Sequence, residues 1–127
     1  MDAAPGTRQP KNPKKSLDER EKAFEAKYQL DDAIAFKAAA RRAKLLGLWV
    51  AGRLGLAGDD ALAYAWSAVE ADLADPGHAT LFARLGRDLV EKAGEGADAG
   101  LAEEFARLAP IAREQAIAEA QASKPAS

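Results

Sequence analysis

The sequence predicts an all-α protein, a four-helix bundle with a long first helix and a disordered N-terminal tail. Hydrophobic residues make up 48% of the chain and aromatic residues only 6%, and much of the difference is alanine, the best helix former. No stretch alternates apolar and polar residues with a period of two, so no sheet is expected. With 127 residues and no cysteine, the chain is too short for a two-domain enzyme and has no thiol chemistry.

The N-terminal end differs in composition from the rest of the chain. Residues 1–15 contain three of the six prolines, and residues 1–16 carry a net charge of +3, which leaves −5 for the remainder. Such a stretch buries too little apolar surface to offset its ordering entropy. Residues 1–15 are therefore predicted to be a disordered, basic, proline-rich extension, and residues 121–127 a disordered C-terminal tail.

The first helix is expected to be unusually long. Ser16 and Glu19 fit a capping box that places its start, and no proline follows before residue 54, which gives a helix of about 57 Å. Residues 17–44 are dense in charge and are expected to project, whereas residues 45–56 look like core and are expected to be docked. An amphipathic stripe with a seven-residue repeat occupies two adjoining rows: Leu17, Phe24, Asp31, Ala38, Leu45 and Gly52, and Tyr28, Ala35, Arg42, Trp49 and Leu56.

The second helix is expected to begin at a glycine break. Gly58 supplies the break, Asp59 the N-cap, and Pro76 with Gly77 the end. Large apolar residues at spacings of 4, 3 and 4 predict its apolar face, made of Leu62, Trp66, Val69 and Leu73.

Two further helices complete the predicted bundle. The third is closed by glycines at residues 94–96, and the fourth starts near Asp98, with Pro110 expected to kink or restart it. Their apolar positions are Leu81, Phe82, Leu85 and Leu89 in the third helix, and Leu101, Phe105, Leu108, Ile111 and Ile117 in the fourth.

The sequence offers few residues for catalysis. The one histidine, His78, is able to bind a metal with Asp72 or Asp75, but an exposed residue at a helix start is the favoured interpretation. Ser67 has no acid and base placed near it by any specific pattern, and a small residue on the second helix is favoured. No enzyme activity, cofactor or metal is expected.

Two other clusters have competing interpretations. Gly52 and Gly55 match no phosphate-binding pattern and are expected to let another helix pack closely. Arg41, Arg42 and Lys44 form a basic cluster for which a solvated face is the favoured interpretation and a contact with a partner the alternative.

Composition also limits the partners. The four cations of the tail have no aromatic residue among them and give only weak, salt-sensitive nucleic-acid binding, so a nucleic-acid-associated protein ranks behind a protein-binding one. No segment approaches the roughly 20 apolar residues of a membrane span, and the start lacks the apolar core of a secretory signal. A cytoplasmic protein without membrane insertion is expected.

Several runs of residues carry a family resemblance. They are Asp18-Glu19-Arg20-Glu21-Lys22-Ala23-Phe24-Glu25, Phe36-Lys37-Ala38, Ala40-Arg41-Arg42, Lys44-Leu45-Leu46-Gly47-Leu48-Trp49, Leu54-Gly55-Leu56, Gly58-Asp59 and Ala63-Tyr64-Ala65. Over about residues 16–120 the chain resembles the zeta subunit of alphaproteobacterial F1Fo-ATP synthase. The resemblance implies a four-helix ATPase inhibitor, which is not an enzyme and needs no cofactor.

The resemblance also implies a mechanism. In that family a mobile N-terminal arm folds as it enters a catalytic interface between the alpha and beta subunits, beside gamma, and blocks rotation in the direction of ATP hydrolysis. Carried over to this chain, the arm is residues 16–32 and the bundle residues 33–120, and the protein is peripheral to the inner membrane through F1. The alternative is a structural or assembly subunit of the same complex that does not inhibit.

The carry-over assigns the partner-binding residues. Phe24 and Tyr28 are expected to be buried ring anchors, and the charged residues of the arm to pair with charges on the groove walls. The full predicted set is Ser16, Leu17, Asp18, Glu19, Arg20, Glu21, Lys22, Phe24, Glu25, Lys27, Tyr28, Arg41 and Arg42.

Overall fold

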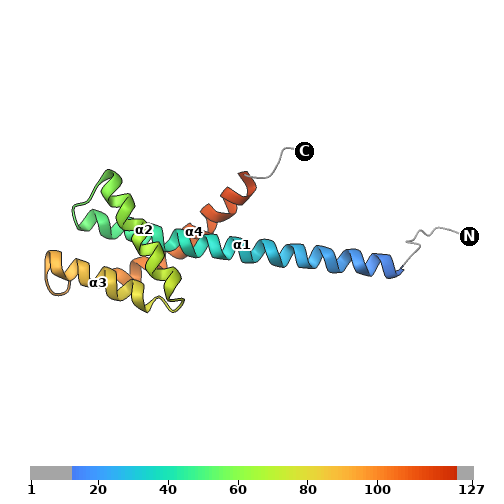
Figure 1. Ribbon diagram of the computed structural model, residues 1–127, viewed down its shortest axis with the longest axis horizontal. Helices are drawn as coiled ribbons and strands as arrows, with labels where there is room; N and C mark the ends of the chain where they lie inside the picture. Colours follow the sequence, from blue (N-terminus) through green and yellow to red (C-terminus); the bar gives the residue numbers. More distant parts are fainter. Residues whose placement is uncertain (1–12, 123–127) are drawn as a thin grey trace, which may run out of the picture. The chain divides into compact units, whose positions relative to one another are not determined.

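The computed structural model describes residues 13–122, apart from the side chains of residues 13–18, 24, 26 and 28. The described chain forms helices α1 (Pro13–Arg53), α2 (Gly58–Ala74), α3 (Ala79–Ala93) and α4 (Leu101–Ala122), shown in Figure 1. No residue of this part is in a strand, which confirms the all-α prediction. The disorder predicted for residues 1–12 and 123–127 falls outside the described residues.

The start of α1 differs from the predicted one. The helix begins at Pro13, three residues before the expected cap at Ser16, so the three residues from Pro13 to Lys15 are helical and not part of a disordered tail. Proline suits the first position of a helix, because its φ is already close to helical and its missing N–H has no partner there.

The chain divides into two units, Met1–Ala33 and Ile34–Ser127. In the first unit, every described side chain between Glu19 and Ala33 is exposed. The second unit contains the remainder of α1 with α2, α3 and α4, and it has a continuous apolar core. The core consists of Ala43, Leu46, Val50, Ala68, Val69, Leu81, Leu85, Leu89, Leu101, Phe105 and Leu108.

The buried line of α1 differs from the predicted stripe. It runs through Ala43, Leu46 and Val50, all of which are fully buried, at spacings of 3 and 4. Leu45, from the predicted stripe, is only half-buried, and Gly52 is exposed. The prediction followed a seven-residue repeat, whereas the buried positions are those around Gly47, where α1 meets Ala65 and Ala68 of α2.

Gly47 is the position where α1 and α2 come closest. A Cβ atom at Gly47 would lie 2.8 Å from the Cα of Ala65 and 3.0 Å from the Cβ of Ala68, so only glycine fits without a shift of the backbone. The prediction that Gly52 and Gly55 allow close packing is wrong, because a Cβ at either position has nothing within 4 Å.

Gly55 instead ends α1. Its φ of 81° is left-handed, and the following N–H, that of Leu56, donates to the carbonyl of Ala51 at 2.9 Å while its own N–H donates to Gly52 at 3.2 Å. These two bonds form a Schellman motif, which satisfies carbonyls that the end of the helix leaves free.

The ends of α2 and α3 are set by local chemistry. The N-cap of α2 is Ala57, not Asp59, which lies in the first turn beside Asp60, where carboxylates favour the helix dipole. α3 ends before Gly94, which has a φ of 96°, as the predicted glycine closure requires.

α4 starts later than predicted and is not interrupted. Its first residue is Leu101, and the preceding residues form a turn in which the N–H of Leu101 donates to the carbonyl of Asp98 at 3.2 Å. The helix continues through Pro110, so the predicted restart is wrong. No helix of the described residues is long and apolar enough to cross a membrane.

Candidate partner-binding site

Most of the predicted partner-binding residues lie on the N-terminal stretch of α1. Six of them are charged residues with exposed side chains: Glu19, Arg20, Glu21, Lys22, Glu25 and Lys27. The side chains of the other five, Ser16, Leu17, Asp18, Phe24 and Tyr28, lie outside the described set, although their backbone is part of α1. One exposed apolar side chain of this stretch was not assigned to the site, namely Leu30, at 49% exposure.

Arg41 is held at the contact between α1 and α4. Its Nη2 lies 2.8 Å from Glu119 Oε2, and Nη1 donates to Gln115 Oε1 at 3.5 Å. Lys37 reaches the same carboxylate of Glu119, with Nζ 3.8 Å from Oε1. Arg41 keeps 31% of its side chain exposed, so it binds within the unit and remains accessible.

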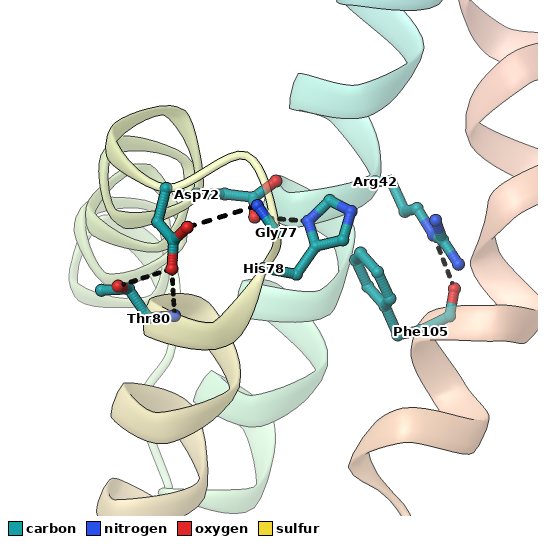
Figure 2. Close-up of polar contacts among 7 residues, drawn as sticks. Arg42, Asp72, Gly77, His78, Thr80 and Phe105 are labelled. Atoms are coloured by element: carbon teal, nitrogen blue, oxygen red, sulfur yellow. Dashed lines mark hydrogen bonds and ion pairs between the residues drawn. The ribbon is translucent and has the colours of Figure 1, made fainter.

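Arg42 makes a different contact with α4, drawn in Figure 2. Its Nε donates a hydrogen bond of 2.7 Å to the carbonyl oxygen of Phe105, and its guanidinium carbon lies 3.5 Å from the centre of the Phe105 ring. Burial lowers the pKa of Arg42, and the nearby Asp72 carboxylate opposes this shift. The interpretation of Arg42 as part of a solvated face is therefore wrong.

His78 stands at the N-cap of α3 and is half-buried, not exposed as expected. Its Nδ1 lies 2.7 Å from Oδ1 of Asp72, a carboxylate with only 9% of its surface exposed. The imidazole also meets the Phe105 ring edge-on, with 5.0 Å between ring centres. Its φ of 68° is unusual for a residue other than glycine. This contact has no local signal in the sequence, because Phe105 lies 27 residues further along the chain.

The Asp75 carboxylate is occupied by hydrogen bonds within the turn between α2 and α3. Its carboxylate accepts hydrogen bonds from the N–H of Gly77 at 3.3 Å, and from the N–H and the Oγ1 of Thr80, both at 3.0 Å (Figure 2). The bonds from Thr80 hold the pKa of Asp75 below its usual range. Among residues 13–122 no group of three or more His, Cys, Asp or Glu side chains is placed to hold a metal ion.

Ser67 and its neighbours likewise serve the fold. The Ser67 hydroxyl donates to the carbonyl of Tyr64 at 2.6 Å, as a serine inside a helix commonly does. The Tyr64 hydroxyl donates to Asp88 Oδ2 at 2.6 Å, which ties α2 to α3. Burial, followed by the bond to Asp88, raises the pKa of Tyr64. The hydroxyl of Ser67 thus faces a backbone carbonyl and not a base.

The unit also has an open cleft where the end of α1 meets the start of α4. The guanidinium carbon of Arg53 lies 4.1 Å from the centre of the Trp49 ring, and Glu104 pairs with Arg107. The cleft is lined by Trp49, Arg53, Gly100, Glu103, Glu104 and Arg107. Its charged groups are of both signs, and two of them, Glu104 and Arg107, are paired with each other.

The predicted apolar face of α2 is turned mostly outward. Val69 is buried, but Leu62, Trp66 and Leu73 are 43%, 54% and 55% exposed. The four residues were predicted as the apolar face of the helix, but three of them do not face the core, because α2 buries its alanines at the close approach to α1 described above. The ammonium of Lys44 lies 4.9 Å from the centre of the Trp66 ring.

A comparison with protein-family models matches residues 14–115 to a family described as ATPase inhibitor subunit zeta. Neither the curated proteins nor the solved structures gave a match. The matched range begins one residue after the start of α1 and ends inside α4, so it includes residues of both units.

Proposed function

Because the chain belongs to the ATPase inhibitor subunit zeta family, we propose that it inhibits ATP hydrolysis by the F1 part of an ATP synthase through the N-terminal stretch of α1. The observation that carries this proposal is the uniform exposure of the described side chains between Glu19 and Ala33. A helix of mixed charge with so few buried groups is marginal in water by itself and gains its order from a partner.

The proposed mechanism is steric. Residues 16–32 enter a catalytic interface formed by the alpha and beta subunits beside gamma, and block rotation in the direction of hydrolysis. Anions and cations alternate from Glu19 to Lys27, so that this part of the stretch matches a groove whose walls carry both signs. Phe24 and Tyr28 are the proposed ring anchors. The proposed wedge acts by position alone and needs no chemistry of its own.

The other parts of the chain have supporting roles in this proposal. The four-helix arrangement with a long first helix lets one element belong to both the arm and the bundle. Arg41 and Arg42 complete the proposed partner contacts, and Arg41 is the more accessible of the two. The protein acts in the cytoplasm, peripheral to the inner membrane through F1.

The test is inhibition of purified F1. Full-length protein is expected to lower the rate of ATP hydrolysis, and the full-length variant Arg20→Glu/Lys22→Glu/Lys27→Glu to lose at least about tenfold in inhibitory potency, because the arm becomes uniformly acidic. Arg84→Glu/Lys92→Glu/Arg113→Glu, which reverses three exposed cations of α3 and α4 and so makes the same change of charge, is the matched control and is expected to inhibit normally. Equal potency of both variants would contradict a role for the charges of the arm.

The ring anchors are tested separately. Phe24→Ala and Tyr28→Ala are each expected to weaken inhibition while the thermal unfolding of the protein stays nearly unchanged. A large fall in melting temperature would show that these rings belong to a core.

The second candidate is a structural or assembly subunit that does not inhibit. The exposed apolar face of α2 favours it, because that face offers a contact outside the arm. Binding to F1 in pull-down experiments together with unchanged hydrolysis would select this candidate over the inhibitor.

A further inference from the structure

The outer side of α2 carries large apolar residues together with carboxylates. We use the term α2 face for Asp59, Leu62, Trp66, Glu70 and Leu73, which are all exposed. Their spacings of 3, 4, 4 and 3 place them on one side of a helix. The residues that α2 buries are smaller: Ala65, Ala68, Val69, Ala71 and Asp72.

This distribution is the reverse of what burial alone would produce. Each large apolar side chain gains roughly 1.5–3 kcal/mol from full burial, and alanine gains much less. Since α2 buries four small apolar residues and leaves a tryptophan and two leucines in water, the fold does not account for the large residues. Grouped apolar residues on a surface, edged by polar ones, mark sites of interaction.

The charge of α2 has one sign. The helix contains Asp59, Asp60, Glu70 and Asp72, and no lysine or arginine. Within residues 13–122, neither Asp59 nor Glu70 forms an ion pair. The ammonium of Lys44, on α1, lies 4.9 Å from the centre of the Trp66 ring, so one face of this ring already has a cation of the chain itself.

These charges select among the possible occupants. An anionic membrane surface attracts lysine and arginine, and α2 has none. A second copy packed through the same face would bring the carboxylates of two α2 helices together, which is unfavourable. A basic amphipathic helix satisfies both features, because its apolar side covers Trp66 and the leucines while its cations pair with Asp59 and Glu70.

We propose that the α2 face is a docking surface for a basic amphipathic helix of a partner protein. This surface is distinct from the proposed arm. Binding of a partner to the α2 face can therefore be measured separately from ATPase inhibition. The failure of the docking proposal would leave the inhibitor proposal intact, and the reverse also holds.

The test uses full-length protein and a fluorescein-labelled helical peptide of about 18 residues, built from leucine on one side and lysine on the other. A matched peptide has glutamate in place of lysine. Fluorescence anisotropy is expected to show binding of the lysine peptide at ~0.15 M salt and none of the glutamate peptide. Trp66→Ala/Glu70→Lys is expected to weaken binding at least about tenfold.

The matched control is Phe36→Ala/Glu91→Lys, which removes an exposed aromatic residue of α1 and an exposed acid of α3. It makes the same change of charge and is expected to bind the peptide as the unmodified protein does. Asp59→Lys/Glu70→Lys keeps the apolar residues and is expected to gain affinity for the glutamate peptide, which tests the face even if the loss of Trp66 harms folding.

Four results would overturn the proposal. They are absence of lysine-peptide binding, equal binding of both peptides, equal losses in the α2 variant and its control, and a dimer in light scattering that Trp66→Ala converts to a monomer. The last result would assign the face to a second copy.

Discussion

Helices α2 and α4 have similar amphipathic patterns but use them in opposite ways. The large residues of α4 are in the core, with Leu101, Phe105 and Leu108 each only 5% exposed. On α2 the large residues Trp66 and Leu73 are more than half exposed, while alanines are buried. The spacing of apolar residues therefore predicts which residues share one side of a helix, but it does not predict whether that side packs against the core.

The difference comes from the neighbouring helix. Close approach at Gly47 leaves room on α2 only for small side chains such as Ala65 and Ala68, so that the larger ones are displaced outward. α4 packs with full-sized side chains, and Phe105 contacts Arg42, His78 and Phe82 there. The stability of the unit should therefore depend on large side chains in α4 and on small ones in α2.

The largest effect is expected for Phe105→Ala. The change removes a buried ring at the centre of the α4 contacts and is expected to lower the free energy of unfolding by about 3–5 kcal/mol. Urea denaturation followed by circular dichroism measures it. A loss below about 1 kcal/mol would show that α4 relies no more on large side chains than α2 does.

The next effect is expected for Gly47→Val. Side-chain atoms there overlap the backbone of Ala65, and overpacking of this kind costs about 1–3 kcal/mol of unfolding free energy. The control is Gly52→Ala, at an exposed helical position with open space, which is expected to stabilise the protein by roughly 0.5–1 kcal/mol. The same sign for both changes, in urea denaturation, would contradict the close approach.

A smaller effect is expected for Tyr64→Phe, which removes the hydrogen bond to Asp88. The loss should be about 1 kcal/mol near neutral pH. Because the pKa of Tyr64 is raised in the folded protein, its contribution is present below pH ~10 and lost as pH rises further, where only the unfolded chain releases the proton. Unfolding curves between neutral and alkaline pH should therefore differ in slope between the two proteins. Parallel curves would contradict the raised pKa.

The smallest effect is expected for Trp66→Ala. Its ring is 54% exposed, and alanine has the higher helix propensity, so thermal denaturation should show a change within about 0.5 kcal/mol. A loss as large as that of Phe105→Ala would place Trp66 in the core and remove the reason for a docking surface on α2.

The parts of the fold that were predictable are those set by local chemistry. Gly94 closes α3 where the sequence placed the closure, and the absence of alternating residues gave the all-α class. The family was predictable because runs of residues such as Lys44-Leu45-Leu46-Gly47-Leu48-Trp49 can be recognised in the sequence without a structure. None of these features requires knowledge of which helices meet.

The features that were missed depend on distant residues. Gly47 and Gly52 cannot be distinguished in the sequence. The position of α2 leaves no room for a side chain at Gly47 and open space at Gly52. Arg42 reaches the carbonyl of Phe105, 63 residues away, so its burial has no local signal. For the candidate site, the described charged side chains of the arm are exposed, as expected of a partner-binding segment. The exposure of Trp66 could not be predicted from the sequence, because it depends on how closely α2 approaches α1.

The paired cations on Glu119 have a consequence for local opening. The contacts of Lys37 and Arg41 with this carboxylate are exposed, and the last fully buried side chain of α4 is Ala116, one turn earlier. Salt screens exposed ion pairs and leaves apolar contacts in place. Backbone amides after Ala116 should therefore exchange with solvent through fraying of the helix end, faster as salt rises, while those near Phe105 exchange only when the whole unit unfolds.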